Sequence, residues 1–176
     1  MPLRTETYDL DEEVQRLEDK IAELDDVLED IEDDNPVAQR FENERVGLET
    51  TLEGVRWARD EAFEADYAPQ WDEDADTITL GGLTAGEFGS IEDDIADGSG
   101  QGAVRIYQVA RGTVDAPYVD DGMDDDQQIG AVSQLPLAYT KWAQTRIDEL
   151  TGVGGNGETS YSELYAEMQA TASDRT

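Results

Sequence analysis

The chain has 176 residues, a length typical of one compact domain, and its 44 acidic residues against 12 basic ones give a formal net charge of −32. A charge of this sign disfavours nucleic-acid binding, because no basic patch offsets it. Histidine and cysteine are absent, which excludes disulfide bonds, thiolate chemistry and imidazole ligands for metals. No apolar run approaches the roughly 20 residues of a membrane span. We therefore expect no enzyme, no cofactor and no membrane partner.

The acidic residues lie within segments that keep a regular apolar period, so the charge does not indicate a disordered chain. It is typical of proteins adapted to molar salt, because at about 1 M salt the Debye length is only about 3 Å and like charges hardly repel one another. We expect an extremely halophilic source, either an archaeon or a virus of such a host. The N-terminus, Met1 to Arg4, lacks the apolar core of a signal peptide, which predicts a location in a virion or in the host cytoplasm.

Two amphipathic helices are predicted between Asp9 and Ala65. Apolar residues of the first helix recur at alternating steps of four and three, the pattern of a coiled-coil seam. Asp9 and Asn35 are predicted N-caps, and Pro36 suits a first helical position because no N–H is needed there. A turn at Asp33–Pro36 predicts an antiparallel hairpin. The predicted seam consists of Leu10, Val14, Leu17, Ile21, Leu24, Leu28, Ile31, Phe41, Leu48, Leu52 and Val55.

An aromatic group follows at the end of the second helix. One interpretation is a small core where the hairpin meets the rest of the chain. The alternative is a partner interface, because tryptophan and tyrosine are enriched at interaction hot spots. The group consists of Trp57, Phe63, Tyr67 and Trp71.

The predicted organisation is a helical hairpin projection (1–68), a linker (69–76) and a small, mostly helical body (77–176) with one or two short strands. Within the body we expect a strand over 77–80, a helix from Ala85 to about Asp97 with Thr84 and Glu87 as its capping box, a helix over 137–150 and a last short helix after Ser160. Residues 103–112 are compatible with strand or helix, and the helix is favoured. Residues 113–130 are predicted to form a loop.

Two motifs in the body suggest ligand sites and also have simpler interpretations. Residues 152–157 match G-x-G-x-x-G, but they follow a helix rather than a strand, which favours a helix stop and a flexible linker. The run from Asp120 to Asp126 carries carboxylates that could ligate a hard cation, yet its spacing differs from that of the calcium-binding loop of EF-hands. A solvated acidic loop is the favoured interpretation of this run, and cation binding stays open.

The segment Asp76–Leu80 leads into Leu83-Thr84-Ala85-Gly86-Glu87-Phe88, and further on Leu135-Pro136 opens a helix containing Trp142 and Ile147. In these features residues 76–150 resemble the tail assembly proteins, or tail chaperones, of long-tailed viruses. The resemblance implies a non-enzymatic role in which the protein binds other viral structural proteins, such as tail proteins, as part of a larger assembly. A cellular haloarchaeal adaptor that self-associates through its coiled coil is the second hypothesis.

Overall fold

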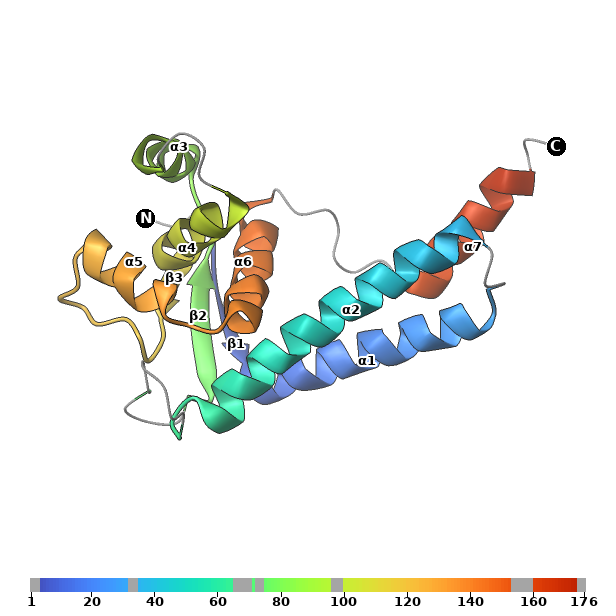
Figure 1. Cartoon of the computed structure of the whole chain (residues 1–176), viewed down its shortest axis with the longest axis horizontal. Helices are drawn as coiled ribbons and strands as arrows, with labels where there is room; N and C mark the ends of the chain where they lie inside the picture. Colours follow the sequence, from blue (N-terminus) through green and yellow to red (C-terminus); the bar gives the residue numbers. More distant parts are fainter. Residues whose placement is uncertain are drawn as a thin grey trace.

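The computed structural model describes residues 4–31, 35–64, 71, 75–95, 100–152 and 160–173. Within these ranges the protein is mostly helical, with a small antiparallel sheet in the order β1-β2-β3, which confirms the predicted fold class (Figure 1). The elements are β1 (Thr5–Asp9), α1 (Leu10–Glu29), α2 (Pro36–Arg56), the π-helix η1 (Trp57–Glu61), β2 (Thr77–Gly81), α3 (Ala85–Asp94), α4 (Gln101–Gly112), β3 (Thr113–Asp115), α5 (Asp125–Ser133), α6 (Leu137–Thr151) and α7 (Tyr161–Ser173).

Strand β1 was not predicted, since residues 1–8 carry only a short alternating pattern. It pairs with the central strand β2, so that Tyr8 lies opposite Ile78 on the buried face of the sheet. Asp9 ends the strand and is also the N-cap of α1, where its carboxylate accepts a hydrogen bond of 3.0 Å from the backbone N–H of Glu12. The strand therefore continues into the helix with no residue between them.

Helices α1 and α2 form the predicted antiparallel hairpin, which extends from the body as an arm (Figure 1). Asn35 caps α2 by accepting from the N–H of Val37, and Pro36 is its first residue, both as predicted. Every predicted seam residue is buried or half-buried. Leu10, Val14, Leu17, Leu52 and Val55 belong to the main core, whereas Leu24, Ile31 and Phe41 form a second cluster, with Val27, near the tip of the arm.

Three ion pairs cross between the helices of the arm, each with its arginine on α2 or η1 and its carboxylate on α1. They join Arg45 to Asp25 at 3.6 Å, Arg56 to Glu18 at 2.5 Å and Arg59 to Asp11 at 3.0 Å. The arginines at 45 and 59 thus face acidic residues beside the seam. Because these pairs lie at the surface, where water screens them, they contribute little to stability.

The aromatic group divides between core and surface. Trp57 and Trp71 are buried and their rings meet edge-to-face at 5.1 Å, so the prediction of a partner interface is wrong for these two residues. Both rings also contact Tyr139 of α6, which explains their burial, because α6 closes the junction of arm and body. Phe63 is 45% exposed, and Tyr67 lies outside the described residues.

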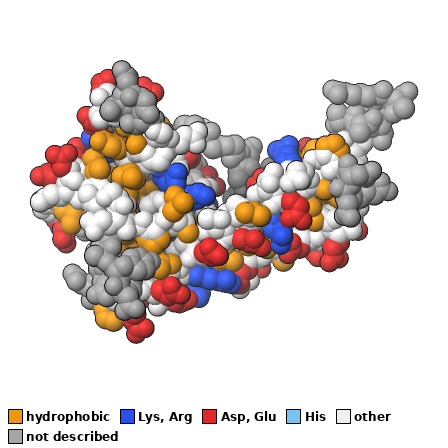
Figure 2. All heavy atoms as spheres, in the orientation of Figure 1, with side chains coloured by type: hydrophobic (Ala, Val, Ile, Leu, Met, Phe, Trp, Pro, Cys, Tyr) orange, Lys and Arg blue, Asp and Glu red, His pale blue; other side chains and the backbone are white. Residues whose placement is uncertain are grey.

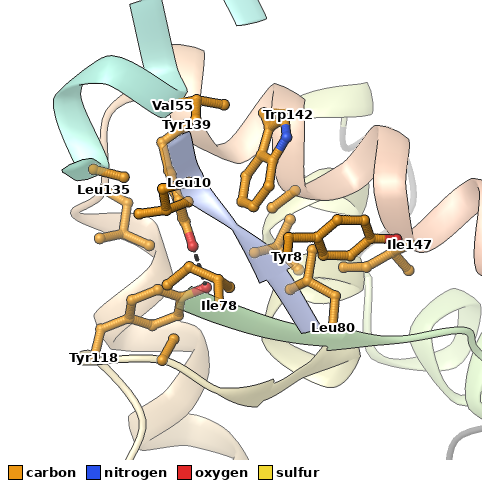
Figure 3. Packing of buried hydrophobic residues seen from close by; sticks show 14 of the residues in the cluster. Tyr8, Leu10, Val55, Ile78, Leu80, Tyr118, Leu135, Tyr139, Trp142 and Ile147 are labelled. Atoms are coloured by element: carbon orange, nitrogen blue, oxygen red, sulfur yellow. Dashed lines mark hydrogen bonds between the residues drawn. The ribbon is translucent and has the colours of Figure 1, made fainter. Parts of the chain in front are cut away.

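The body surrounds helix α6, which covers the sheet and contacts both α2 and α4. Figure 3 shows Tyr139, Trp142 and Ile147 of this helix directed at apolar side chains of β1 and β2. Within this core the hydroxyls of Tyr139 and Tyr118 lie 3.1 Å apart, and Tyr118 also pairs with Thr113 at 2.9 Å. Burial raises the pKa of Tyr118 to about 12 and holds the pKa of Tyr139 well above its ordinary value.

Helix α3 begins with the predicted capping box of Thr84 and Glu87. Residues 103–112 belong to helix α4, which confirms the helix that was favoured for them. The loop predicted over 113–130 is wrong in part, because it contains β3 and most of α5. Asp124 caps α5 by accepting from the N–H of Gln127, whose side chain accepts in return from the N–H of Asp124. The acidic run therefore begins a helix.

One close approach fixes α6 against the arm. A β-carbon added at Gly54 of α2 would lie 2.3 Å from the carbonyl carbon of Ala138 and 2.4 Å from the backbone nitrogen of Tyr139. Only glycine allows the two helix backbones to come so near at this crossing. Gly54 thereby sets the distance between the arm and the body.

Helix α7 lies along the arm near its tip (Figure 1). Tyr161 and Tyr165 meet the ring of Phe41 edge-to-face at 6.1 and 6.5 Å, and the hydroxyl of Ser160 binds the carboxylate of Glu23. Two elements therefore cross the predicted division into residues 1–68 and 77–176. Strand β1 joins the sheet of the body, and α7 adds to the arm.

Candidate functional site: a basic pocket between arm and body

A pocket of about 560 Å³ opens where α1, α2, α6 and α7 converge. Its apolar wall includes Leu17, Leu48, Trp142 and Leu164. Its volume lies within the range usual for small-molecule sites, about 300–1,000 Å³. The pocket is therefore large enough to hold a ligand rather than a few waters.

The charge of this pocket is the reverse of the charge of the whole chain. Four basic residues line it, Arg16, Lys20, Lys141 and Arg146, against two acidic ones, Glu44 and Glu149. The chain has only two lysines, and both are here. Acidic side chains are spread over the arm and the body on the face seen in Figure 2. We call this site the basic pocket.

A buried ion cluster forms the floor of the basic pocket. Glu13 and Arg146, with side chains 7% and 11% exposed, are joined by two hydrogen bonds of 2.5 and 3.0 Å. Arg16 binds the same carboxylate at 3.0 and 3.2 Å, and the indole N–H of Trp142 donates to it at 2.8 Å. The guanidinium of Arg146 also lies 4.9 Å from the centre of the Tyr8 ring. The cluster ties α1 to α6 across the base of the arm.

The electrostatics of the cluster favour the charged forms. Burial opposes ionisation of Glu13, but hydrogen bonds from Arg146 and Arg16 outweigh it and lower the pKa of this carboxyl below its ordinary value. Burial likewise disfavours the charge on Arg146, yet bonds to Glu13 and Glu149 raise its pKa. Two carboxylates, Glu13 and Glu149, therefore face the two arginines of the cluster.

The two acidic residues that line the pocket are already engaged. Glu149 binds Arg146 at 2.6 Å, and Glu44 accepts a hydrogen bond of 3.1 Å from the hydroxyl of Tyr161. Lys141 is exposed and makes no ion pair with any described residue. Burial, followed by the charge of Arg16, lowers the pKa of Lys20. The pocket thus keeps an excess of positive charge.

The structure describes parts of the two sequence motifs that suggested ligand sites. Gly152 ends α6 with φ of 80°, as a helix stop does, and residues 153–157 of the glycine motif lie outside the described residues. In the acidic run, Asp125 pairs with Arg111 at 3.1 Å. The described part of the chain contains no group of three or more histidine, cysteine or carboxylate residues placed to hold a metal ion.

Sequence reasoning missed the basic pocket, although one signal pointed to it. Glu13 lies three residues after Leu10 and four before Leu17, so it stands on the buried face of α1, where an acid needs a cationic partner. Its partners come from α6, far along the chain, and no local pattern predicts them.

None of the helices in the described ranges combines the length and the apolar character that crossing a bilayer requires. Comparisons with protein-family models, with curated proteins and with solved structures found no match to this chain.

Proposed function

We propose that this protein is a non-enzymatic assembly or structural protein of a tailed virus or provirus of a halophilic archaeon, acting through protein–protein contacts in the tail, the connector or the capsid. The observation that carries the proposal is the arm. Its helices of 20 and 21 residues are about 30 Å long, and its outer half packs only on itself and on α7 among the described elements. The arm has its own apolar cluster near its tip, so its outer half is held together without packing on the body. The outer surface of the arm is therefore available for contacts with other proteins.

Two further features support the proposal. The net charge of −32 is carried by a folded, well-packed chain, as in proteins of molar-salt environments. Strand β2 followed by the capped helix α3 is the local arrangement on which the resemblance to tail assembly proteins rests. A virion or the cytoplasm of a high-salt host would be its location.

The second candidate is a cellular adaptor that self-associates through its arm. The observation in its favour is Val46, which is 53% exposed on α2 and would be covered by a second arm. This candidate predicts a concentration-dependent dimer of the purified protein in molar KCl, measured by sedimentation equilibrium.

Mass spectrometry of gradient-purified virus particles from a halophilic culture that carries this gene tests the proposal. Stoichiometric presence in particles supports a structural role, and abundance in infected cells without presence in particles supports a role as assembly chaperone. Absence from both contradicts the viral proposal and favours the adaptor.

Adaptation to salt predicts that the melting temperature rises by roughly 10 °C between 0.2 and 3 M KCl, because screening removes repulsion worth a few kcal/mol. Circular dichroism measures the melting temperature. A variant with Asp26→Asn and Glu29→Gln, two exposed carboxylates of α1, should be more stable than the wild type in 0.2 M KCl and gain less from added salt. A melting temperature independent of KCl would contradict the adaptation.

A further inference from the structure

We infer that the basic pocket binds a small organic anion that carries its charge at one end of an apolar body. This inference is independent of the assembly role, because it concerns a pocket at the base of the arm rather than the arm's outer surface.

The distribution of charge is the first step. In a chain where acids outnumber bases 44 to 12, a single pocket gathers four bases, including both lysines, against two acids. The acids of this pocket are already bound to Arg146 and Tyr161, and Glu13 beneath it is shared between two arginines. A hydrogen bond from a neutral tyrosine leaves the charge of Glu44 in place, so four bases face three carboxylates, and the net positive charge is complementary to an anion.

The position of the cations is the second step. Lys20 comes from α1 and Lys141 from α6, so they approach the pocket from different elements. Burial, and after it the charge of Arg16, lowers the pKa of Lys20, and an anion between these groups would offset the repulsion between the two cations. A bound anion would therefore be held by several cations at once.

The apolar wall and the salt select the class of anion. In molar KCl an inorganic anion must compete with chloride at comparable charge, and electrostatic attraction is short-ranged. Apolar contact is not screened, and Leu17, Leu48, Trp142 and Leu164 provide it within the same pocket. A carboxylate or sulfonate joined to an aromatic or alkyl body can contact both the basic and the apolar residues that line the pocket.

A pair of fluorescent probes tests this inference in 2 M KCl. 1-Anilinonaphthalene-8-sulfonate has an aromatic body with one anionic group, and N-phenyl-1-naphthylamine has nearly the same body without it. We expect the sulfonate to bind one site per chain. The double variant Lys20→Gln, Lys141→Gln should weaken its binding by about tenfold or more, since bonds between charged groups are lost. Binding of the neutral probe should be unchanged.

Arg40→Gln is the matched control, because it removes one exposed basic side chain of the arm that does not line the pocket. This variant should bind both probes with the affinity of the wild type. Circular dichroism of each variant checks that the fold is intact. Octanoate should displace the sulfonate, whereas octanol should not. Equal loss of sulfonate binding in the control and the double variant, or equal affinity of the two variants and the wild type, would overturn the inference.

Discussion

Replacing Gly54 by alanine should destabilise the protein by about 3 kcal/mol, although alanine is the better helix former. The new β-carbon would meet backbone atoms of Ala138 and Tyr139 at 2.3 to 2.5 Å, and backbone atoms cannot rotate away. The helices α2 and α6 must then separate, which opens the core around Val55 and Trp142. Urea unfolding in 2 M KCl, followed by circular dichroism, measures the change in the free energy of unfolding.

Gly47→Ala is the control on the same helix. A β-carbon at Gly47 meets no atom within 4 Å, so this variant should gain up to about 1 kcal/mol from helix propensity alone. The two substitutions are chemically identical and differ only in what surrounds them. Equal effects on the free energy of unfolding would show that α2 and α6 do not approach at Gly54.

Replacing Glu13 by glutamine should cost about 3 kcal/mol in neutral solution. The substitution leaves Glu149 as the remaining counter-charge of Arg146, whose side chain is 11% exposed, and removing one partner of a buried ion pair is strongly destabilising. Glu18→Gln is the control on α1, because its pair with Arg56 is exposed and contributes about 1 kcal/mol or less. Urea unfolding of the wild type and both variants in 2 M KCl measures how much each substitution changes the free energy of unfolding.

The effect of Glu13→Gln should depend on pH in one direction. The pKa of Glu13 is lower in the folded state than its ordinary value of 4.5, so its stabilising contribution is complete above that value and is lost as the pH falls through the folded pKa. The difference in stability between wild type and variant should therefore shrink below about pH 4.5. A difference that stays constant down to pH 2 would mean that the Glu13 charge does not carry the effect.

The parts of the fold that the sequence predicted are those set by local chemistry. The steps between Leu10 and Ile31 define one face of α1, and Asp9, Asn35 and Thr84 cap helices through their own side chains. Periodicity and capping act over a few residues, so they can be read without the tertiary structure.

The parts that were missed depend on distant partners or on a motif hidden by composition. Strand β1 is defined by its pairing with β2, some 70 residues later, and its own five residues carry little signal. Helix α5 has a local capping box, Asp124 with Gln127, but it stands in an acidic run that resembles a loop. The basic pocket needed the packing of α6 against the arm, because Glu13 and Arg146 are neighbours only in the folded chain.

The junction at Asp9 has a mechanical consequence. This residue is both the last of β1 and the cap of α1, so the chain has no hinge between the sheet and the arm. Rotating the arm about its base would have to break the cap or peel β1 from β2, and α6 braces the opposite side at Gly54. The arm therefore behaves as a lever fixed to the sheet, and a load applied at its tip would reach the body as torque.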